Sequence, residues 1–414
     1  MRVYKIASFS VVILLVTVVL AGVAIVPAVA QYDTMQYRYN AAHAGDYSPV
    51  AGPVPSNGQL KWGLTTGSVV ISSPAVSNGV VYVGSDDGNV YALNATTGMK
   101  VWNYTTAGEV YSSPAVSNGV VYVGSENNKV YALNATTGVK VWSFTTGDAV
   151  LSSPAVVNGV VYVGSNDYNV YALNATTGAK LWNYTTGRAV LASPAVSNGV
   201  VYVGSENNNV YALNATTGVK VWNYTTGDAV LSSPAVTNGT VYVGSENNKV
   251  YALNATTGVK VWSFTTGGGV YSSPAVVNGV VYVGSKNNKV YALNATTGVN
   301  VWNYTTGGEV NSSPAVVNGG VYVGSNDYNV YALNATTGVK VWSFTTGSAV
   351  LSSPAVVNGT VYVGSYNSNV YAIGNEAAAT SQGTTPGFDV VLAFIGLVFV
   401  GLVIAAYAVK TYRY

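Results

Sequence analysis

Residues 132–142 read Ala-Leu-Asn-Ala-Thr-Thr-Gly-Val-Lys-Val-Trp, and close copies of this stretch return every 40 residues along the chain. The tetrapeptide Ser-Pro-Ala-Val keeps the same step. All eight tryptophans belong to the repeat, and they are Trp62, Trp102, Trp142, Trp182, Trp222, Trp262, Trp302 and Trp342. A fixed period of about 40 residues is typical of a propeller, a solenoid or an array.

Each repeat predicts four short strands. In the repeat that ends near Trp142 they are residues 113–116, 120–124, 130–133 and 139–144, which are rich in β-branched and aromatic residues. Asn118-Gly119 is a strong hairpin signal between the first two strands. No stretch of the repeat has a helical period, and four strands per repeat are typical of a propeller blade. The fold class is therefore all-β.

The ends of the repeat region distinguish a ring from an open array. The first tryptophan strand, residues 60–66, precedes the first Ser-Pro-Ala-Val, whereas the last repeat stops at Ile373 without a tryptophan strand. If residues 60–66 form the outer strand of the last blade, eight blades of four antiparallel strands close into a ring. An open solenoid would need distinct end caps. We therefore predict an eight-bladed β-propeller over residues 60–374.

The repeated stretch resembles the tryptophan-docking motif of PQQ-like (quinoprotein) β-propellers, in which Ala-x-Asp-x-x-Thr-Gly-x-x-x-Trp recurs once per blade. Asn134 replaces the usual aspartate here. The resemblance implies that each tryptophan packs between neighbouring blades against the turn that carries the glycine. Residues 36–45 resemble the leader found before such propellers, so we expect His43, within a leader segment 31–59, to be a packing residue.

The same resemblance raises a rival function, a PQQ-dependent quinoprotein oxidoreductase. Such enzymes hold PQQ and calcium over the ring axis with a dissimilar set of acids, an arginine and often a vicinal cysteine pair. Here the near-identical repeats line the axis with Ser-Ser-Pro-Ala-Val and place no unique acid or base there. Catalysis needs an asymmetric constellation of groups. We therefore expect no catalytic residue, no cofactor and no metal site.

Composition excludes further classes of function. Charged residues make up only 8% and the net charge is +2, which argues against a nucleic-acid binder. There are no cysteines and one histidine, so disulfides, thiolate zinc sites and catalytic triads are absent. Asp86-Asp87-Gly88 is a weak calcium signal, because ordinary turn chemistry explains it.

The repeats differ mainly in two loops, which an up-and-down blade places on one face. These are the loop between the second and third strands and the blade-to-blade loop. We predict this acidic face to bind a protein or glycan partner, and its candidate residues are Asp86, Asp87, Glu109, Glu126, Asp148, Asp167, Tyr168, Arg188, Asp228, Glu309, Asp327, Tyr328 and Tyr366.

The opposite face is basic and is expected to lie toward an anionic membrane surface. It carries no acid, and its lysines are Lys61, Lys100, Lys140, Lys180, Lys220, Lys260 and Lys340.

Both ends of the chain are hydrophobic. Residues 1–30 are typical of a secretory signal peptide that ends in Ala28-Val29-Ala30, and an uncleaved anchor is the alternative. Residues 390–409 carry no charge and predict a transmembrane helix, followed by a basic cytoplasmic tail, 410–414. We therefore expect a terminal hydrophobic helix at each end and a membrane-tethered protein.

Residues 375–389 form a linker that contains Pro386-Gly387-Phe388. With the apolar span and the short basic tail, this tripeptide resembles the archaeal PGF-CTERM sorting signal, which implies cleavage nearby and attachment to a lipid. A plain single-pass anchor is the alternative. Either version places the propeller at the cell surface, on the extracellular side of the plasma membrane.

Sequons are abundant, and in an exported protein they can be glycosylated. They begin at Asn94, Asn103, Asn134, Asn174, Asn183, Asn214, Asn223, Asn238, Asn254, Asn294, Asn303, Asn311, Asn334 and Asn358. The sequence thus predicts a non-catalytic cell-surface scaffold, adhesion or ligand-binding module.

Overall fold

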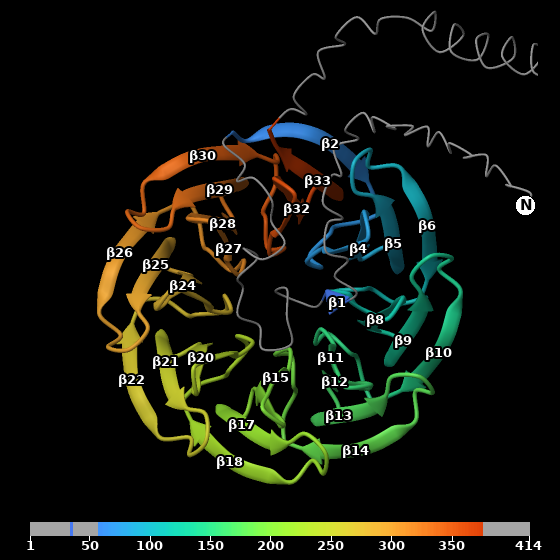
Figure 1. Cartoon of the computed structure of the whole chain (residues 1–414), viewed down its shortest axis with the longest axis horizontal. Helices are drawn as coiled ribbons and strands as arrows, with labels where there is room; N and C mark the ends of the chain where they lie inside the picture. Colours follow the sequence, from blue (N-terminus) through green and yellow to red (C-terminus); the bar gives the residue numbers. More distant parts are fainter. Residues whose placement is uncertain (1–33, 36–56, 376–414) are drawn as a thin grey trace, which may run out of the picture. The chain divides into compact units, whose positions relative to one another are not determined.

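In the computed structural model, residues 34–35 and 57–375 are described, and residues 57–375 form a closed ring of eight β-sheets (Figure 1). The predicted signal peptide, most of the leader with His43, the linker beyond Asn375, the sorting motif, the transmembrane helix and the tail lie outside the described residues. Within the described ranges, no helix is long and apolar enough to cross a membrane.

The strands of each blade follow one another from the axis to the rim. The innermost strands are β3 (Ala75–Ser77), β7 (Ala115–Ser117), β11 (Ala155–Val157), β15 (Ala195–Ser197), β19 (Ala235–Thr237), β23 (Ala275–Val277), β27 (Ala315–Val317) and β31 (Ala355–Val357). The second strands are β4 (Val80–Gly84), β8 (Val120–Ser125), β12 (Val160–Gly164), β16 (Val200–Gly204), β20 (Thr240–Ser245), β24 (Val280–Ser285), β28 (Gly320–Gly324) and β32 (Thr360–Gly364).

The third and outer strands complete the blades. The third strands are β5 (Asn89–Asn94), β9 (Lys129–Asn134), β13 (Asn169–Asn174), β17 (Asn209–Asn214), β21 (Lys249–Asn254), β25 (Lys289–Asn294), β29 (Asn329–Asn334) and β33 (Asn369–Gly374). The outer strands are β6 (Lys100–Thr105), β10 (Lys140–Thr145), β14 (Lys180–Thr185), β18 (Lys220–Thr225), β22 (Lys260–Thr265), β26 (Asn300–Thr305), β30 (Lys340–Thr345) and β2 (Gln59–Thr65). We number the blades 1 to 8 in the order of their innermost strands.

The first tryptophan strand closes the ring, as predicted. β2 pairs antiparallel with β33, with Leu60 opposite Ile373, and the sheet of blade 8 runs in the order β2-β33-β32-β31. The backbone N–H of Asn57 also donates to Oδ1 of Asn375, at 3.2 Å. The eight-bladed, antiparallel propeller is therefore confirmed.

Three details differ from the sequence prediction. Blade 2 has five strands rather than four, because β1 (Thr34–Met35) pairs antiparallel with β7 at the inner edge of that sheet. The innermost strand of blade 2 begins at Ala115 instead of residue 113, since Pro114 has no N–H to donate to a strand ladder. The other predicted strand ends in the quoted repeat and in β2 differ by at most one residue.

Each blade is covered by a neighbour on both sides, so its middle strands are buried on both faces. In β12, Val161 and Val163 are fully buried and Tyr162 is nearly so. The strand ends at Gly164, where a Cβ atom would lie 2.4 Å from Cγ1 of Val190, in the loop that leads to the next blade. Neighbouring blades therefore approach closely enough that only glycine fits this position.

The Asn-Gly hairpins have the geometry that their sequence predicts. Asn118 and Gly119 have φ angles of 49° and 72°, so both central residues of the turn lie in the left-handed region. This is the type I′ pattern, whose twist matches that of the flanking strands.

Candidate binding faces and the ring axis

The two faces of the disc are built from different connections. On one side, the blade-to-blade loops contact the loops between the second and third strands, since the N–H of Asp86 donates to the carbonyl of Val69 at 3.0 Å. We call this side the loop face. On the other side, the Asn-Gly turns contact the Asn-Ala-Thr-Thr-Gly turns, since the N–H of Ala95 donates to the carbonyl of Gly79 at 2.8 Å. We call this side the turn face.

Charge is segregated between these faces. Every aspartate and glutamate within residues 57–375 lies in a loop of the loop face. The lysines that begin the outer strands lie beside the turns of the turn face. Lys61 is offset from them, because it occupies the bulge between Leu60 and Trp62, which is the register position of Val101 in blade 1. Its Nζ donates to Oγ1 of Thr360 at 2.9 Å.

Each tryptophan joins its blade to the next one. Nε1 of Trp142 donates to the carbonyl of Ala175 in blade 3 at 2.9 Å, and the hydroxyl of Tyr122 donates to the same carbonyl at 3.1 Å. A Cβ atom on Gly178 would lie 2.7 Å from Cδ2 of Trp142, so the indole packs directly on this turn. The tryptophans thus lie between blades and have a packing role.

Blade 8 has no Asn-Ala-Thr-Thr-Gly turn to cover Trp342. The N-terminal segment replaces it, because a Cβ atom on Gly58 would lie 2.6 Å from Cε3 of Trp342. The segment that closes the ring therefore also supplies the missing docking surface.

Serines that are buried, apart from the half-buried Ser73, form a continuous belt around the ring axis. In each blade, the backbone N–H of the serine before Pro-Ala-Val donates to Oγ of the equivalent serine in the next blade. The bonds are 2.9–3.0 Å long and connect Ser73, Ser113, Ser153, Ser193, Ser233, Ser273, Ser313, Ser353 and again Ser73. The hydroxyls at this level of the axis therefore accept hydrogen bonds within the fold.

A quinone cofactor with calcium does not fit the donors that the described residues provide. Calcium takes six to eight oxygen ligands, with carboxylates prominent among them. Residues 34–35 and 57–375 contain no group of three or more histidine, cysteine, aspartate or glutamate side chains placed to hold a metal ion. Each serine oxygen of the belt already accepts one backbone N–H, and Arg188, the arginine within residues 57–375, lies on the loop face.

Some candidate acids of the loop face hold the loops in place. Oδ2 of Asp167 accepts hydrogen bonds from the N–H of Gly147 and the hydroxyl of Tyr171, both at 2.6 Å. Burial acts to raise the pKa of Asp167, but these bonds and those from Asn169 outweigh it and lower the pKa. Asp87 and Asp327 make the same contacts in blades 1 and 7.

A second set of acids gathers where blades 1 and 2 meet. Burial raises the pKa of Asp86 to about 6, and the negative charges of Glu109 and Glu126 act in the same direction. Oδ1 of Asp86 is buried without a hydrogen-bond partner. Burial and Glu109 also raise the pKa of Glu126, and the Tyr111 hydroxyl donates to Glu109.

In the corresponding region of blades 5 to 7, a lysine balances part of the negative charge of the acids. Nζ of Lys286 lies 4.0 Å from the centre of the Tyr271 ring, and the Tyr271 hydroxyl donates to Glu246. Nearby, Nδ2 of Asn311 donates to Oε2 of Glu309 at 3.2 Å. The loop face is therefore not uniform, although the repeats that carry it are nearly identical.

Three candidate tyrosines project from the loop face. Tyr168 and Tyr328 are 49% and 51% exposed, and Tyr366 is 39% exposed. Tyr168 and Tyr328 also have φ angles of 75°. At the same position five of the other blades have glycine or asparagine, which tolerate left-handed backbone better, and blade 8 has serine. Those residues are Gly88, Asn128, Asn208, Asn248, Asn288 and Ser368.

The other candidate residues of this face, Asp148, Arg188 and Asp228, are exposed in the blade-to-blade loops. Oδ1 of Asp148 and of Asp228 accepts the N–H of the following alanine, at 2.7 and 2.8 Å.

The sequons fall into distinct environments. In the Asn-Ala-Thr set, Oδ1 accepts two backbone N–H groups, as Asn94 does from Thr96 and Thr97 at 3.0 and 2.9 Å. These turns are at the surface. Asn311 is different, because it is half-buried and bonded to Glu309. Asn103 in an outer strand and Asn238 in an Asn-Gly turn are exposed as well.

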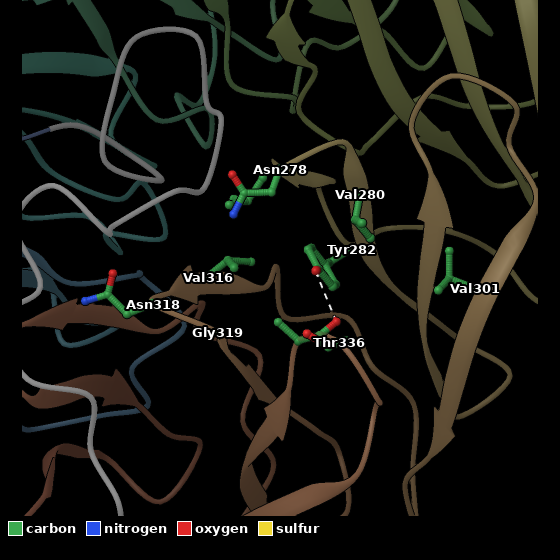
Figure 2. A pocket seen from close by; sticks show the side chains of 10 residues that line it. Asn278, Val280, Tyr282, Val301, Val316, Asn318, Gly319 and Thr336 are labelled. Atoms are coloured by element: carbon green, nitrogen blue, oxygen red, sulfur yellow. Dashed lines mark hydrogen bonds between the residues drawn. The ribbon is translucent and has the colours of Figure 1, made fainter.

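A pocket of 530 Å³ opens on the turn face between blades 6 and 7 (Figure 2). Valines 277, 280, 301 and 316 supply its apolar walls, and Asn278 and Asn318 supply amides. The Tyr282 hydroxyl at its base donates to the carbonyl of Ala335 at 3.2 Å. The repeat pattern did not predict this pocket, since its walls come from two different blades, 6 and 7.

Solved structures share this fold at low sequence identity. BamB from Moraxella catarrhalis is 20% identical, with a TM-score of 0.67, and the match covers 77% of this chain and 100% of that one. Quinohemoprotein alcohol dehydrogenase from Comamonas testosteroni is 16% identical, with a TM-score of 0.71 and coverage of 84% and 81%. A europium-containing methanol dehydrogenase is 15% identical, with a TM-score of 0.72 and coverage of 82% and 98%.

No curated protein matches the sequence of this chain. A family model does match it, in three overlapping segments, residues 49–193, 169–272 and 265–378. Together these segments span most of the chain, including all eight blades. The chain therefore belongs to the family described as outer membrane protein assembly factor BamB, within the PQQ-like propeller repeats.

Proposed function

We propose that this protein is a non-catalytic scaffold of the cell envelope that binds a protein partner through its loop face. The observation that carries the proposal is the pair Tyr168 and Tyr328. Both have left-handed backbone with φ of 75°, and both remain about half exposed. Left-handed backbone in a bulky residue is costly, and such strain clusters at functional sites. Burial of these side chains does not compensate for it.

The chemistry of these side chains suits a protein interface. Tyrosine supplies a large amphipathic surface with few rotatable bonds and is enriched at interface hot spots. Blades 3 and 7, which carry Tyr168 and Tyr328, lie four blades apart on the ring. The surrounding acids favour a partner with a basic surface, and charge complementarity accelerates association.

Fold similarity alone does not decide between a scaffold and an enzyme. The similar structures include BamB and quinoprotein dehydrogenases. We favour a scaffold because the axis repeats one serine-rich segment and its donors do not suit calcium or a quinone. The membership in the BamB family supports a protein partner.

We further propose an exported, membrane-tethered protein on the extracellular side, with Pro386-Gly387-Phe388 as sorting motif and glycans on some of its sequon asparagines. The support for these points is the pattern of the sequence. A glycan partner is the alternative for the loop face, where amides and tyrosines lie side by side.

Cross-linking followed by affinity capture from the native cell envelope tests the partner. The double variant Tyr168→Asn/Tyr328→Asn removes the aromatic side chains and restores the residue found at this position in blades 2, 4, 5 and 6. The matched control, Ser263→Ala/Ser343→Ala, changes exposed residues of two outer strands that belong neither to the loop face nor to the turns of the turn face. We expect the tyrosine variant to capture at least fivefold less of the partner proteins than the wild type and the control capture. Equal capture by all three would contradict the proposal.

A titration with PQQ and calcium tests the rival function. The absorbance of the purified protein should show no stoichiometric quinone after gel filtration. One tightly bound quinone per chain would replace the scaffold with an oxidoreductase.

A further inference from the structure

The turn face carries an unusual number of exposed apolar side chains. Each outer strand begins with a lysine between two apolar residues, apart from β26, where asparagine replaces lysine, and β2. We call these segments the rim tripeptides, and they are residues 99–101, 139–141, 179–181, 219–221, 259–261, 299–301 and 339–341. Met99 is 71% exposed, Val139 65% and Val259 66%.

These apolar side chains are not packed against the rest of their blade. The next residue along each strand, such as Trp142 after Val141, turns into the interface between blades, whereas Val139 and Val141 stay in solvent. Single exposed valines are ordinary on protein surfaces. Here the same exposed pair returns in successive blades around the rim, and in six of them it flanks a lysine.

Because the blades repeat around one axis, the rim tripeptides lie in one plane. Lys140, Lys180 and Lys220 each stand opposite the equivalent leucine of the third strand, so the rim tripeptides have one register. Positions of one register, repeated around one axis, lie on a circle perpendicular to that axis. In Figure 1 the outer strands that begin with them form the perimeter of the ring. A planar surface can therefore contact all of them at once.

The charge on this circle is of one sign. Among residues 57–375, the acids are confined to the loop face, so none neutralises the rim lysines. A flexible lysine between two exposed apolar residues can place its ammonium at phosphate level while its neighbours enter the acyl boundary. Anionic lipids attract such a basic surface.

We infer that the rim tripeptides dock the propeller flat on an anionic lipid bilayer. The contact is additional to any anchor at the ends of the chain, since it arises from the propeller itself. It places the loop face, with Tyr168 and Tyr328, away from the membrane. A protein partner or a second copy of the chain bound to the rim tripeptides would contradict the inference.

The chain has no cysteine, so a single label can be placed at will. We would label the full-length protein with an environment-sensitive dye at Val139→Cys or Val259→Cys on the rim, and at Asp148→Cys on the loop face as the matched control. Each protein is reconstituted in vesicles of phosphatidylcholine with or without 30% phosphatidylglycerol. Quenchers in the lipid and in the water then report the depth of the dye.

We expect lipid quenching at the two rim positions in the anionic vesicles, at least threefold above that at Asp148→Cys. The rim variant, in which Lys100, Lys140, Lys180, Lys220, Lys260 and Lys340 become Gln, should lose this difference, as should neutral vesicles.

Three results would overturn the inference. The first is a rim dye quenched only from the water in every vesicle. The second is lipid quenching that is equal in anionic and neutral vesicles and equal with and without the lysines. A tether at the end of the chain alone would explain such quenching. The third is self-quenching between labelled copies, which indicates that a second chain covers the rim. Circular dichroism of the lysine variant establishes that the blades remain folded.

Discussion

At the scale of single residues, Ala192 interrupts a pattern that the other blades keep. Elsewhere a serine at this position accepts the N–H of the glycine that ends the second strand, as Ser152 does from Gly164 at 3.0 Å. Ala192 is buried and has no hydroxyl for Gly204. Ala192→Ser should therefore stabilise the protein by about 1 kcal/mol, the net value of one hydrogen bond in a buried setting. Denaturant unfolding measures this as a higher midpoint at unchanged slope, and Ser152→Ala is the control that should lower the midpoint.

Asp86 gives a second prediction at this scale. Its pKa of about 6 lies above the unfolded value of 3.8 because of burial, with added repulsion from Glu109, Glu126 and Asp87, while the hydrogen bond from Tyr111 opposes the shift. The folded state therefore binds the proton more tightly, and this group's contribution to stability falls as the pH rises from about 4 to about 6. Because the side chain is partly solvated, we expect Asp86→Asn to gain no more than about 1 kcal/mol at pH 7 and almost nothing at pH 4.

Thermal or denaturant unfolding at the two pH values provides the measurement. Asn166→Asp places an acid at the equivalent position of blade 3 and is the reverse control. A gain for Asp86→Asn that is equal at pH 4 and pH 7 would mean that its charge is not the cause.

At the scale of elements, the glycine in the turn before each tryptophan strand must adopt a positive φ and must also leave room for an indole ring. Gly138 has a φ of 73°, and a Cβ atom there would lie 2.8 Å from the Trp102 ring. Gly119 has a φ of 72° in the Asn-Gly hairpin, with no atom within 4 Å of such a Cβ. Gly119→Ala should cost about 1–2 kcal/mol through backbone strain alone.

Gly138→Ala should cost about 1–3 kcal/mol more, because the methyl group also displaces the indole. Chemical unfolding of the two variants gives the difference directly, and tryptophan fluorescence should shift only for Gly138→Ala. Equal costs would show that the indole moves aside freely.

Most strands could be predicted from the sequence, but some elements and contacts could not. The strand pattern predicted four strands per blade and the closure by residues 60–66, because the alternation and the count at both ends depend only on local sequence. β1 was missed, since a two-residue strand has no periodicity. The serine belt was missed because its hydrogen bonds join residues 40 positions apart. Lys61 was grouped with Lys100, although it adjoins Trp62 directly and so falls in the bulge.

The candidate site was predicted less completely than the fold. The gathering of acids on one face followed from the order of strands. The roles of individual acids did not, because Asp167 and Asp148 have the same chemistry but only Asp167 is held by Gly147 and Tyr171. The strain at Tyr168 and the exposure of Val139 depend on backbone geometry and on neighbouring blades.

At the scale of the whole molecule, the ring has one seam where the chain is not continuous, between β2 and β33. Thr65 and Asn369 face each other there, with a hydrogen bond of 2.6 Å between residues 304 positions apart. Thr105 and Asn89 make the same contact within blade 1, at 2.7 Å and only 16 positions apart. A disulfide at either place has the same local geometry but closes loops of very different length.

Cross-linking the seam should therefore stabilise the ring more than cross-linking the blade. Loop-closure entropy grows with the logarithm of the loop length, which predicts an advantage of about 2–3 kcal/mol for Thr65→Cys/Asn369→Cys over Asn89→Cys/Thr105→Cys. Unfolding of both variants, oxidised and reduced, measures it, and the reduced forms control for the substitutions. Equal stabilisation by the two disulfides would contradict this dependence on loop length. A larger gain at the seam would show that fixing β2, which carries Trp62 and follows directly on Gly58, the residue that covers Trp342, restricts the unfolded chain more than a bond within one blade.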